Sequence, residues 1–327
     1  MSKVAVAEKD IKVPFRWRLK AWWEGYDVAD MEAKLRARNG NATYEELTRD
    51  DSKLEAEKEP ENEKFSWSDA RIQVAQLIWG QGYCGPGGPE NVIAMSKLLA
   101  LTPKHSAMVI GAGLGGPARV LAQEFGVWIS GYEHTEQLAA KGMQMSRDAG
   151  LEKKAPIYYK NFDTIEPFER NFDRAYSKEA FFTIEKKEEL LIEICNNLKE
   201  DSLFLITDYV IRDAEALENA GVQKWLRQEP LDPFPVTSDT MIKHLKDAGF
   251  NIRVNEDITD HYIELIQDAW AEADKVVKTL SARGPESAEN LQMIMQEAQF
   301  WSQRTKLLRS GLLQVHRYLA HKPSVIR

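Results

Sequence analysis

The chain has 327 residues, of which 43% are hydrophobic and 29% are charged, and its formal net charge is −8 at pH 7. This composition is typical of a globular protein with a sizeable core, and the acidic excess argues against a surface that coats nucleic acid. Only Cys84 and Cys195 are present, so we expect no disulfide framework and a reducing, cytoplasmic location. We also expect neither a signal peptide nor a transmembrane segment, because no apolar run is long enough.

Two N-terminal segments precede the region of regular patterning. Residues 1–40 form an aromatic and basic arm that contains "VPFRWRLKAWWEGYD" and then a short helical pattern that closes on Gly40. Residues 41–64 carry nine acidic and four basic side chains and are expected to be a charged, partly helical linker. The arm is a candidate to contact a second copy of the chain or a protein partner, to cover the active site, or to touch a lipid surface, although packing on its own domain is an equally good expectation.

From Phe65 onward, helical and strand patterns alternate, which predicts a parallel sheet with helices on both faces. Residues 65–258 are expected to form a core, 259–310 a helical cap insertion, and 311–327 the final strand and tail. The expected helices cover 66–79, 89–101, 116–125, 135–149, 185–199, 238–250 and, in the insertion, 259–309. The expected strands cover 107–111, 127–132, 156–160, 172–176, 202–208, 251–258 and 312–322.

A glycine-rich turn lies between the first two predicted units, in "VIGAGLGGPARVLAQEFGVWISGYE", residues 109–133. Gly111, Gly113 and Gly115 satisfy both the G-x-G-x-x-G pattern of dinucleotide folds and the G-x-G-x-G pattern of methyltransferases that use S-adenosyl-L-methionine (AdoMet). Glu133 ends the next strand, where a carboxylate accepts hydrogen bonds from ribose hydroxyls in both classes. His134 follows it and is expected near the cofactor. The turn alone does not decide between the two cofactors.

Three later features favour AdoMet. Phe162 and Asp163 follow the third strand, where methyltransferases hold the adenine ring. The loop in "FDRAYSKEAFFTI" follows the fourth strand and places Ser177 at the carboxyl edge of the sheet, where such folds bind ligands. The helical insertion before the last strand is typical of the reversed hairpin of methyltransferase sheets. Against this, Val109 occupies the position where methyltransferases commonly have an acid.

Several longer stretches resemble the phosphoethanolamine N-methyltransferases and their small-molecule relatives, over roughly residues 65–322. The resemblance rests on "IWGQGYCGPGGPENVIAMSKLLAL", "VIGAGLGGPARVLAQEFG", "RAYSKEAFFTIEKKEELL", "LKEDSLFLITDYV" and "LKDAGF" followed by "EDITDHYIELI". It implies an α/β fold: a Rossmann-like, seven-stranded class I methyltransferase sheet with helices on both faces, a helical cap insertion and an N-terminal arm.

The resemblance also locates substrate residues. Trp67 and Thr183 stand where the family has its latch tyrosine and its histidine, and Tyr209 matches a substrate-side tyrosine. The phosphate-binding residues of the family are replaced by "EPLDPFPVT", which puts phosphoethanolamine itself in doubt. Trp79 and Tyr262 complete the expected substrate pocket, and Tyr83 is expected to cover the methionine end of the cofactor. Both tryptophans have a competing interpretation as core residues.

Amine methylation needs a group that accepts a proton, and the candidates are Glu179, Tyr176, His134 and His261. No Cys/His cluster has the spacing of metal ligands, so we expect no metal. The favoured hypothesis is an AdoMet-dependent methyltransferase that acts on an amine nitrogen of a small or medium-sized acceptor. The alternatives are C- or O-methylation of a lipid-like acceptor, and a catalytically weak module that docks a partner through its arm.

Overall fold

The computed structural model describes residues 13–14, 17–18, 20–21, 26, 28–48, 64–281 and 288–324. Most of the aromatic stretch of the arm, residues 49–63 of the expected linker and residues 325–327 of the tail therefore lie outside the described residues.

A seven-stranded sheet organises the described chain, with the strand order β3-β2-β1-β4-β5-β7-β6. All neighbouring strands are parallel except β7, which runs antiparallel to both β5 and β6. The predicted class I methyltransferase sheet is thus confirmed. Its strands are β1 (Ser106–Ile110), β2 (Trp128–Glu133), β3 (Ile157–Tyr159), β4 (Phe172–Lys178), β5 (Leu198–Ile211), β6 (Asn251–Asp257) and β7 (Leu313–His321).

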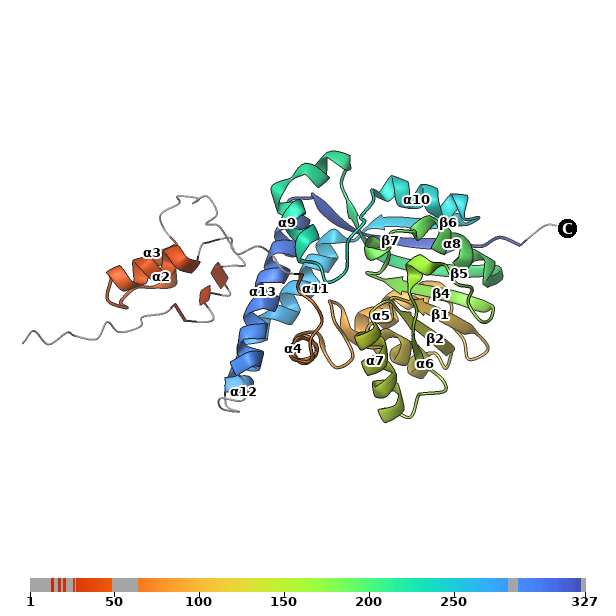
Figure 1. Ribbon diagram of the computed structural model, residues 1–327, viewed down its shortest axis with the longest axis horizontal. Helices are drawn as coiled ribbons and strands as arrows, with labels where there is room; N and C mark the ends of the chain where they lie inside the picture. The colour runs from red at the N-terminus through yellow and green to blue at the C-terminus, as the bar shows by residue number, and fades with distance from the viewer. Residues whose placement is uncertain are drawn as a thin grey trace, which may run out of the picture.

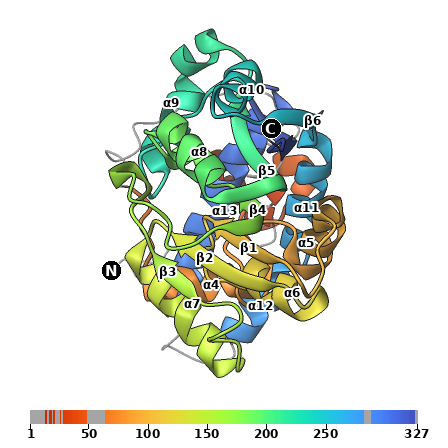
Figure 2. The same cartoon turned by 90° about the vertical axis from the view of Figure 1, so that its right-hand side faces the viewer.

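The central strands are buried on both faces because helices cover both (Figures 1 and 2). In β1, Ala107 and Val109 belong to one hydrophobic cluster, whereas Met108 and Ile110 belong to another. The first cluster includes residues of α4 (Asp69–Trp79), α5 (Gly88–Ser96), α6 (Gly116–Glu124) and α7 (Glu136–Asp148). The second includes residues of α8 (Lys187–Asn196) and α10 (Ser238–Asp247).

Local signals set several helix boundaries. Ser68 caps α4 by accepting a hydrogen bond from the Arg71 amide at 3.1 Å. Helix α10 is capped by Thr237, and Gly249 follows its end with a left-handed φ of 100°. Helix α9 (Ala220–Gln228) was not predicted, and β5 begins before its apolar run because Leu198 already pairs with Phe172 of β4, ahead of a register shift.

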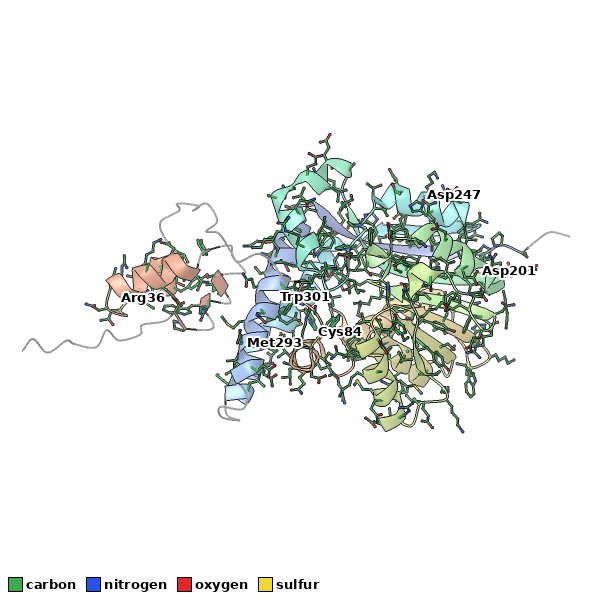
Figure 3. All side chains as sticks on the ribbon, viewed as in Figure 1. Arg36, Cys84, Asp201, Asp247, Met293 and Trp301 are labelled. Carbon is green, nitrogen blue, oxygen red and sulfur yellow. The ribbon has the colours of Figure 1, made fainter. Side chains whose placement is uncertain are left out.

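The described residues between β6 and β7 form three helices: α11 (Thr259–Ala271), α12 (Ala273–Ser281) and α13 (Ala288–Arg309). The long helix α13 runs beside α4 and α11 (Figure 1). Trp301 of α13 packs on Trp79 of α4, with 4.5 Å between the ring centroids. Trp301 therefore lies on the body side of α13, far from Asp201 and Asp247 at the opposite end of the body (Figure 3).

The arm contains α2 (Val28–Ala37) and the one-turn α3 (Tyr44–Leu47), which lie apart from the sheet in Figure 1. Thr43 and Glu46 form a capping box at the start of α3. The buried residues of the two helices form a small cluster with Val13 and Ala21 that shares no member with the clusters around the sheet. No helix among the described residues is long and apolar enough to span a membrane.

Candidate active site

A pocket opens at the carboxyl ends of β1, β2 and β4, next to the point where the strand order reverses between β1 and β4. It holds about 1020 Å³ of empty space, part of which is continuous with solvent, and this is the scale of pockets for small ligands. Its walls come from α4, the glycine-rich loop 82–85, the turn after β1, the end of β2, Phe162, the loop after β4, residues 229–231 and α13.

The turn after β1 and the end of β2 are joined by Glu133. One oxygen of its carboxylate accepts a hydrogen bond from the Gly113 amide at 2.7 Å and the other from the Thr135 amide at 2.8 Å. Burial raises the pKa of Glu133, and the two amide hydrogen bonds oppose that rise. Gly111 and Gly113 both have left-handed φ values, and a Cβ placed on Gly113 would meet no atom within 4 Å. Gly113 thus borders open space beside a buried carboxylate.

Two rings bound the next part of the pocket. Phe162 is 1% exposed and meets the ring of His134 edge to face, with 5.5 Å between the centroids. The Nδ1 atom of His134 is buried and has no hydrogen-bond partner among the described residues. Asp163 does not line the pocket, because its carboxylate turns toward α8 and accepts a hydrogen bond from the Lys186 amide at 2.9 Å.

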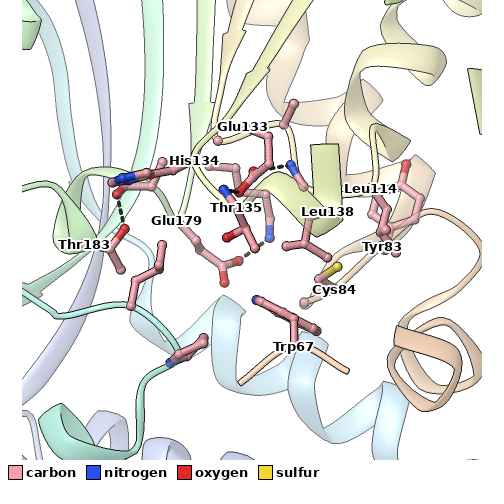
Figure 4. Close-up of a pocket in the computed structure, with 18 of the residues that line it drawn as sticks. Trp67, Tyr83, Cys84, Leu114, Glu133, His134, Thr135, Leu138, Glu179 and Thr183 are labelled. Carbon is pink, nitrogen blue, oxygen red and sulfur yellow. Dashed lines mark hydrogen bonds and ion pairs between the residues drawn. The ribbon is translucent and has the colours of Figure 1, made fainter. Parts of the chain in front are cut away.

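Glu179 projects into the pocket from the loop after β4, toward the same space as Trp67 (Figure 4). One of its carboxylate oxygens forms an ion pair with Lys178 and accepts a hydrogen bond from the hydroxyl of Tyr262 on α11. The other oxygen would lie 3.1 Å from a Cβ placed on Gly85, so the glycine leaves room for the carboxylate. Glu179 has a φ of 54°, which is rare for a residue with a side chain.

The end of the pocket formed by α13 contains a buried ion pair. Arg304 is paired with Glu229, and both side chains are at least 95% buried. Arg304 also donates a hydrogen bond to the hydroxyl of Tyr209 at 3.4 Å, while its Nε atom has no partner among the described residues. Four rings surround the guanidinium with their centroids 4.6 to 6.0 Å from it: Phe182, Tyr209, Phe300 and Trp301.

A second buried arginine lies on the α4 side. Arg71 is paired with Glu297 of α13 at 2.5 Å, and its guanidinium lies 4.2 Å from the centroid of Trp67. Cys84 and Tyr83 also line this side (Figure 4). Burial raises the pKa of the Cys84 thiol to about 12, so the thiol is protonated and is no candidate nucleophile.

Of the residues predicted from the sequence, nine line the pocket: Trp67, Tyr83, Gly111, Gly113, Glu133, His134, Phe162, Glu179 and Thr183. Among those that do not, Gly115 caps α6, and Trp79 packs between Trp270 and Trp301 as a core residue. Tyr209 and Tyr262 lie behind the lining and contact it through Arg304 and Glu179.

Three further predicted residues are placed away from the pocket. Tyr176 and Ser177 are buried within β4, and burial raises the pKa of the Tyr176 hydroxyl, which is unfavourable for a base. His261 is on the exposed side of α11, where its ring lies 3.2 Å from the amide oxygen of Asn91.

The pocket residues that the sequence interpretation missed include charged and aromatic ones: Arg71, Lys178, Glu229, Phe300, Trp301 and Arg304. The last four lie far in the sequence from the glycine-rich turn, and the charges of Arg71 and Arg304 are typical of solvent-exposed helix faces. In hindsight, the aromatic pair Phe300 and Trp301 just before Arg304 was the available signal.

The sheet order, the turn after β1 and Glu133 together define a class I AdoMet-dependent methyltransferase fold. A family model described as mycolic acid cyclopropane synthetase matches residues 91–315. The chain belongs to this family of class I AdoMet-dependent methyltransferases.

Individual relatives agree with this assignment. A phosphoethanolamine N-methyltransferase of Triticum aestivum is 26% identical over 206 residues, covering 62% of this chain and 39% of that protein. The sterol 24-C-methyltransferase of Saccharomyces cerevisiae is 28% identical over 159 residues, covering 48% of this chain and 42% of that protein. The chain thus spans about two fifths of the length of these relatives.

Among solved structures, phosphoethanolamine N-methyltransferase 2 of Haemonchus contortus in complex with AdoMet matches with a TM-score of 0.67 and 21% identity. The match covers 79% of this chain and 58% of that one, and it shows the fold.

AdoMet is the cofactor of this class, and the pocket fits it. The open space at Gly113, the carboxylate of Glu133 and the ring of Phe162 suit the methionine, ribose and adenine parts in turn. The buried, unpartnered Nδ1 of His134 and hydroxyl of Tyr83 offer two further polar contacts.

Proposed function

We propose that the protein transfers the methyl group of AdoMet to an amine nitrogen of a small or medium-sized acceptor. The observation that carries this proposal is the carboxylate of Glu179, which faces the pocket from the loop after β4. When bound, AdoMet supplies an electrophilic methyl group on a sulfonium centre. Glu133, Phe162 and Gly113 would hold it at the carboxyl ends of β1 and β2.

The residues of the chain then have to position the acceptor and remove one proton from its nitrogen, because a protonated amine has no free electron pair. Glu179 is the group in the pocket suited to accept that proton. Lys178 and Tyr262 hold one of its oxygens, which leaves the other, on the Gly85 side, to contact the amine. The rings of Trp67 and Phe182 exclude water and favour the cationic product.

A second candidate is C- or O-methylation of a lipid-like acceptor. It is favoured by the aromatic end of the pocket at Phe182, Phe300 and Trp301, where Arg304 and Glu229 neutralise each other. The family match and the yeast relative agree with this alternative.

The experiment is a methyl-transfer assay with radiolabelled AdoMet and four separate acceptors: ethanolamine, phosphoethanolamine, glycine, and vesicles of dioleoylphosphatidylglycerol. We expect label in an amine. We also expect Glu179→Gln to lower kcat by about 10² to 10⁴ while AdoMet affinity, measured by calorimetry, stays within about twofold of wild type.

Glu264→Gln is the matched control, because Glu264 lies on the exposed side of α11 and does not line the pocket. This control variant should keep wild-type turnover. Label that enters only the vesicles would replace the first candidate with the second, and failure to bind AdoMet would reject both.

A further inference from the structure

The loop after β4 has a backbone shape that normally binds anions. Glu179 is left-handed with a φ of 54°, and Ala180 follows with φ and ψ of −117° and −43°. The Glu179 amide itself donates to the Thr207 carbonyl, whereas the three amides that follow it, those of Ala180, Phe181 and Phe182, turn toward one point and form a concave anion site.

The occupant of this concavity is a side chain of the protein. Asp208 on β5 is 2% exposed and accepts hydrogen bonds from the amides of Ala180 at 3.2 Å, Phe181 at 2.6 Å and Phe182 at 3.3 Å. It also accepts one from the Tyr209 amide at 2.7 Å. Burying a carboxylate is unfavourable unless it is well paired, and three of its four partners belong to a single pocket loop.

That loop carries the acceptor side of the pocket. Glu179, Phe182 and Thr183 all line it. Other contacts also restrain the loop: the Glu179 amide donates to the Thr207 carbonyl at 2.8 Å, the Phe234 amide donates to the Phe182 carbonyl at 2.6 Å, and the rings of Phe181 and Phe182 are buried. None of these contacts occupies the amides of residues 180–182, which are held by Asp208. A left-handed residue with a side chain persists only where its surroundings hold it.

We infer that Asp208 is a positioning residue for methyl transfer: its carboxylate holds the amides of residues 180–182 and so keeps Glu179 and Phe182 facing the acceptor. Asp208 itself does not line the pocket and does not touch the reacting atoms. The effect of Asp208 on the rate of methyl transfer rests on the proposed function, whereas its effect on the structure of the loop does not.

Asp208→Asn tests the inference, because it keeps the shape but turns an NH₂ group toward amides that are themselves donors. Hydrogen exchange of the amides of residues 180–182, followed by mass spectrometry or NMR, should accelerate by about tenfold or more. The kcat/KM for whichever probe amine wild type methylates should fall by about tenfold or more. The Kd of S-adenosylhomocysteine should stay within about twofold, because Glu133 and Phe162 are untouched.

Asp173→Asn is the matched control. Asp173 also accepts hydrogen bonds from a backbone amide, that of Ser106 at 2.8 Å, but it lies at the opposite end of β4. This variant should lose stability without changing exchange at 180–182 or turnover. Asp208→Ser, which leaves room for water to satisfy the amides, serves if Asp208→Asn does not fold.

The inference is overturned if Asp208→Asn loses stability as Asp173→Asn does while loop exchange and kcat/KM stay at wild-type values. If no probe amine is methylated, the proposed function fails on its own, and the exchange of residues 180–182 still decides the role of Asp208.

Discussion

Three carboxylates at the carboxyl edge of the sheet have three different environments, and their proposed roles follow from these. Glu133 accepts hydrogen bonds from two backbone amides and borders open space, so its carboxylate is placed to bind a hydroxyl group of a ligand. Glu179 is held at one oxygen by Lys178 and Tyr262, which leaves the other for proton transfer. Asp208 accepts hydrogen bonds from four backbone amides and does not line the pocket. Environment rather than residue type therefore separates binding, chemistry and positioning.

The pKa of Asp208 leads to a prediction about stability. Burial raises this pKa to about 7, although hydrogen bonds from Phe181, Tyr209 and Phe182 oppose the rise and the charge of Glu179 adds to it. Lys187 of α8 and Tyr318 of β7 are the other titratable groups that interact with it. Between about pH 4 and pH 7 the folded protein keeps a proton on Asp208 that the unfolded chain has lost, so this group stabilises less as the pH rises.

We therefore expect the free energy of unfolding of wild type, relative to Asp208→Asn, to fall by up to about 1.4 kcal/mol per pH unit across this window and to level off above it. Urea unfolding of both proteins at pH 5, 6, 7 and 8 measures the difference. A difference that is constant, or that grows with pH, would mean that Asp208 is ionised throughout.

At the scale of elements, alanine substitutions of two glycines in the turn between β1 and α6 are expected to have different effects. A Cβ on Gly111 would lie 2.4 Å from the Cβ of Ala180, whereas a Cβ on Gly113 meets nothing within 4 Å. Gly111→Ala should destabilise the ligand-free protein by about 2 to 4 kcal/mol through strain and overlap.

Gly113→Ala should lose only about 1 to 2 kcal/mol of stability from its left-handed φ, but should weaken AdoMet binding by about tenfold or more, because the new methyl group occupies the proposed cofactor space. Urea unfolding and calorimetry separate the two effects. Wild-type affinity in Gly113→Ala would remove this turn from the cofactor site.

The elements themselves were largely predictable, because each central strand is an apolar run between turn signals. The first strand was predicted at 107–111 and lies at Ser106–Ile110. The helical pattern of 259–309 was not divided: Gly284 and Pro285 signal the break before α13, whereas no comparable signal separates α11 from α12. Helix α9 was missed because only its Asn219 cap and one amphipathic face mark it.

At the scale of the whole molecule, the part of the pocket at the carboxyl ends of the strands was predictable, whereas the end formed by α13 was not. Gly111, Gly113, Glu133 and Phe162 follow strands directly, so the order of strands in a parallel sheet brings them together. Arg71 pairs with Glu297 because α13 returns beside α4, 226 residues later in the chain, and Arg304 of the same helix pairs with Glu229, 75 residues before it. Sequence spacing carries no signal for such a contact.

Deletion of the N-terminal arm tests whether the arm contributes to the pocket. The described pocket residues fall between Trp67 and Arg304, and the buried residues of α2 and α3 form a separate cluster. Among the described residues, a backbone hydrogen bond from Phe65 to Gln228 and an exposed ion pair between Lys64 and Asp232 attach the start of the body, and both are retained when residues 1–63 are deleted. The truncated chain should fold and bind AdoMet within about twofold of full length, since no cofactor contact is lost.

Light scattering and calorimetry on both chains decide what the arm does. A full-length dimer that becomes a monomer on truncation would assign the arm to self-association, with methyl transfer intact. Loss of AdoMet binding on truncation would instead contradict the separation of the arm from the site. It would mean that the pocket is completed from the N-terminal side and that the boundary predicted at residue 65 divides one functional unit.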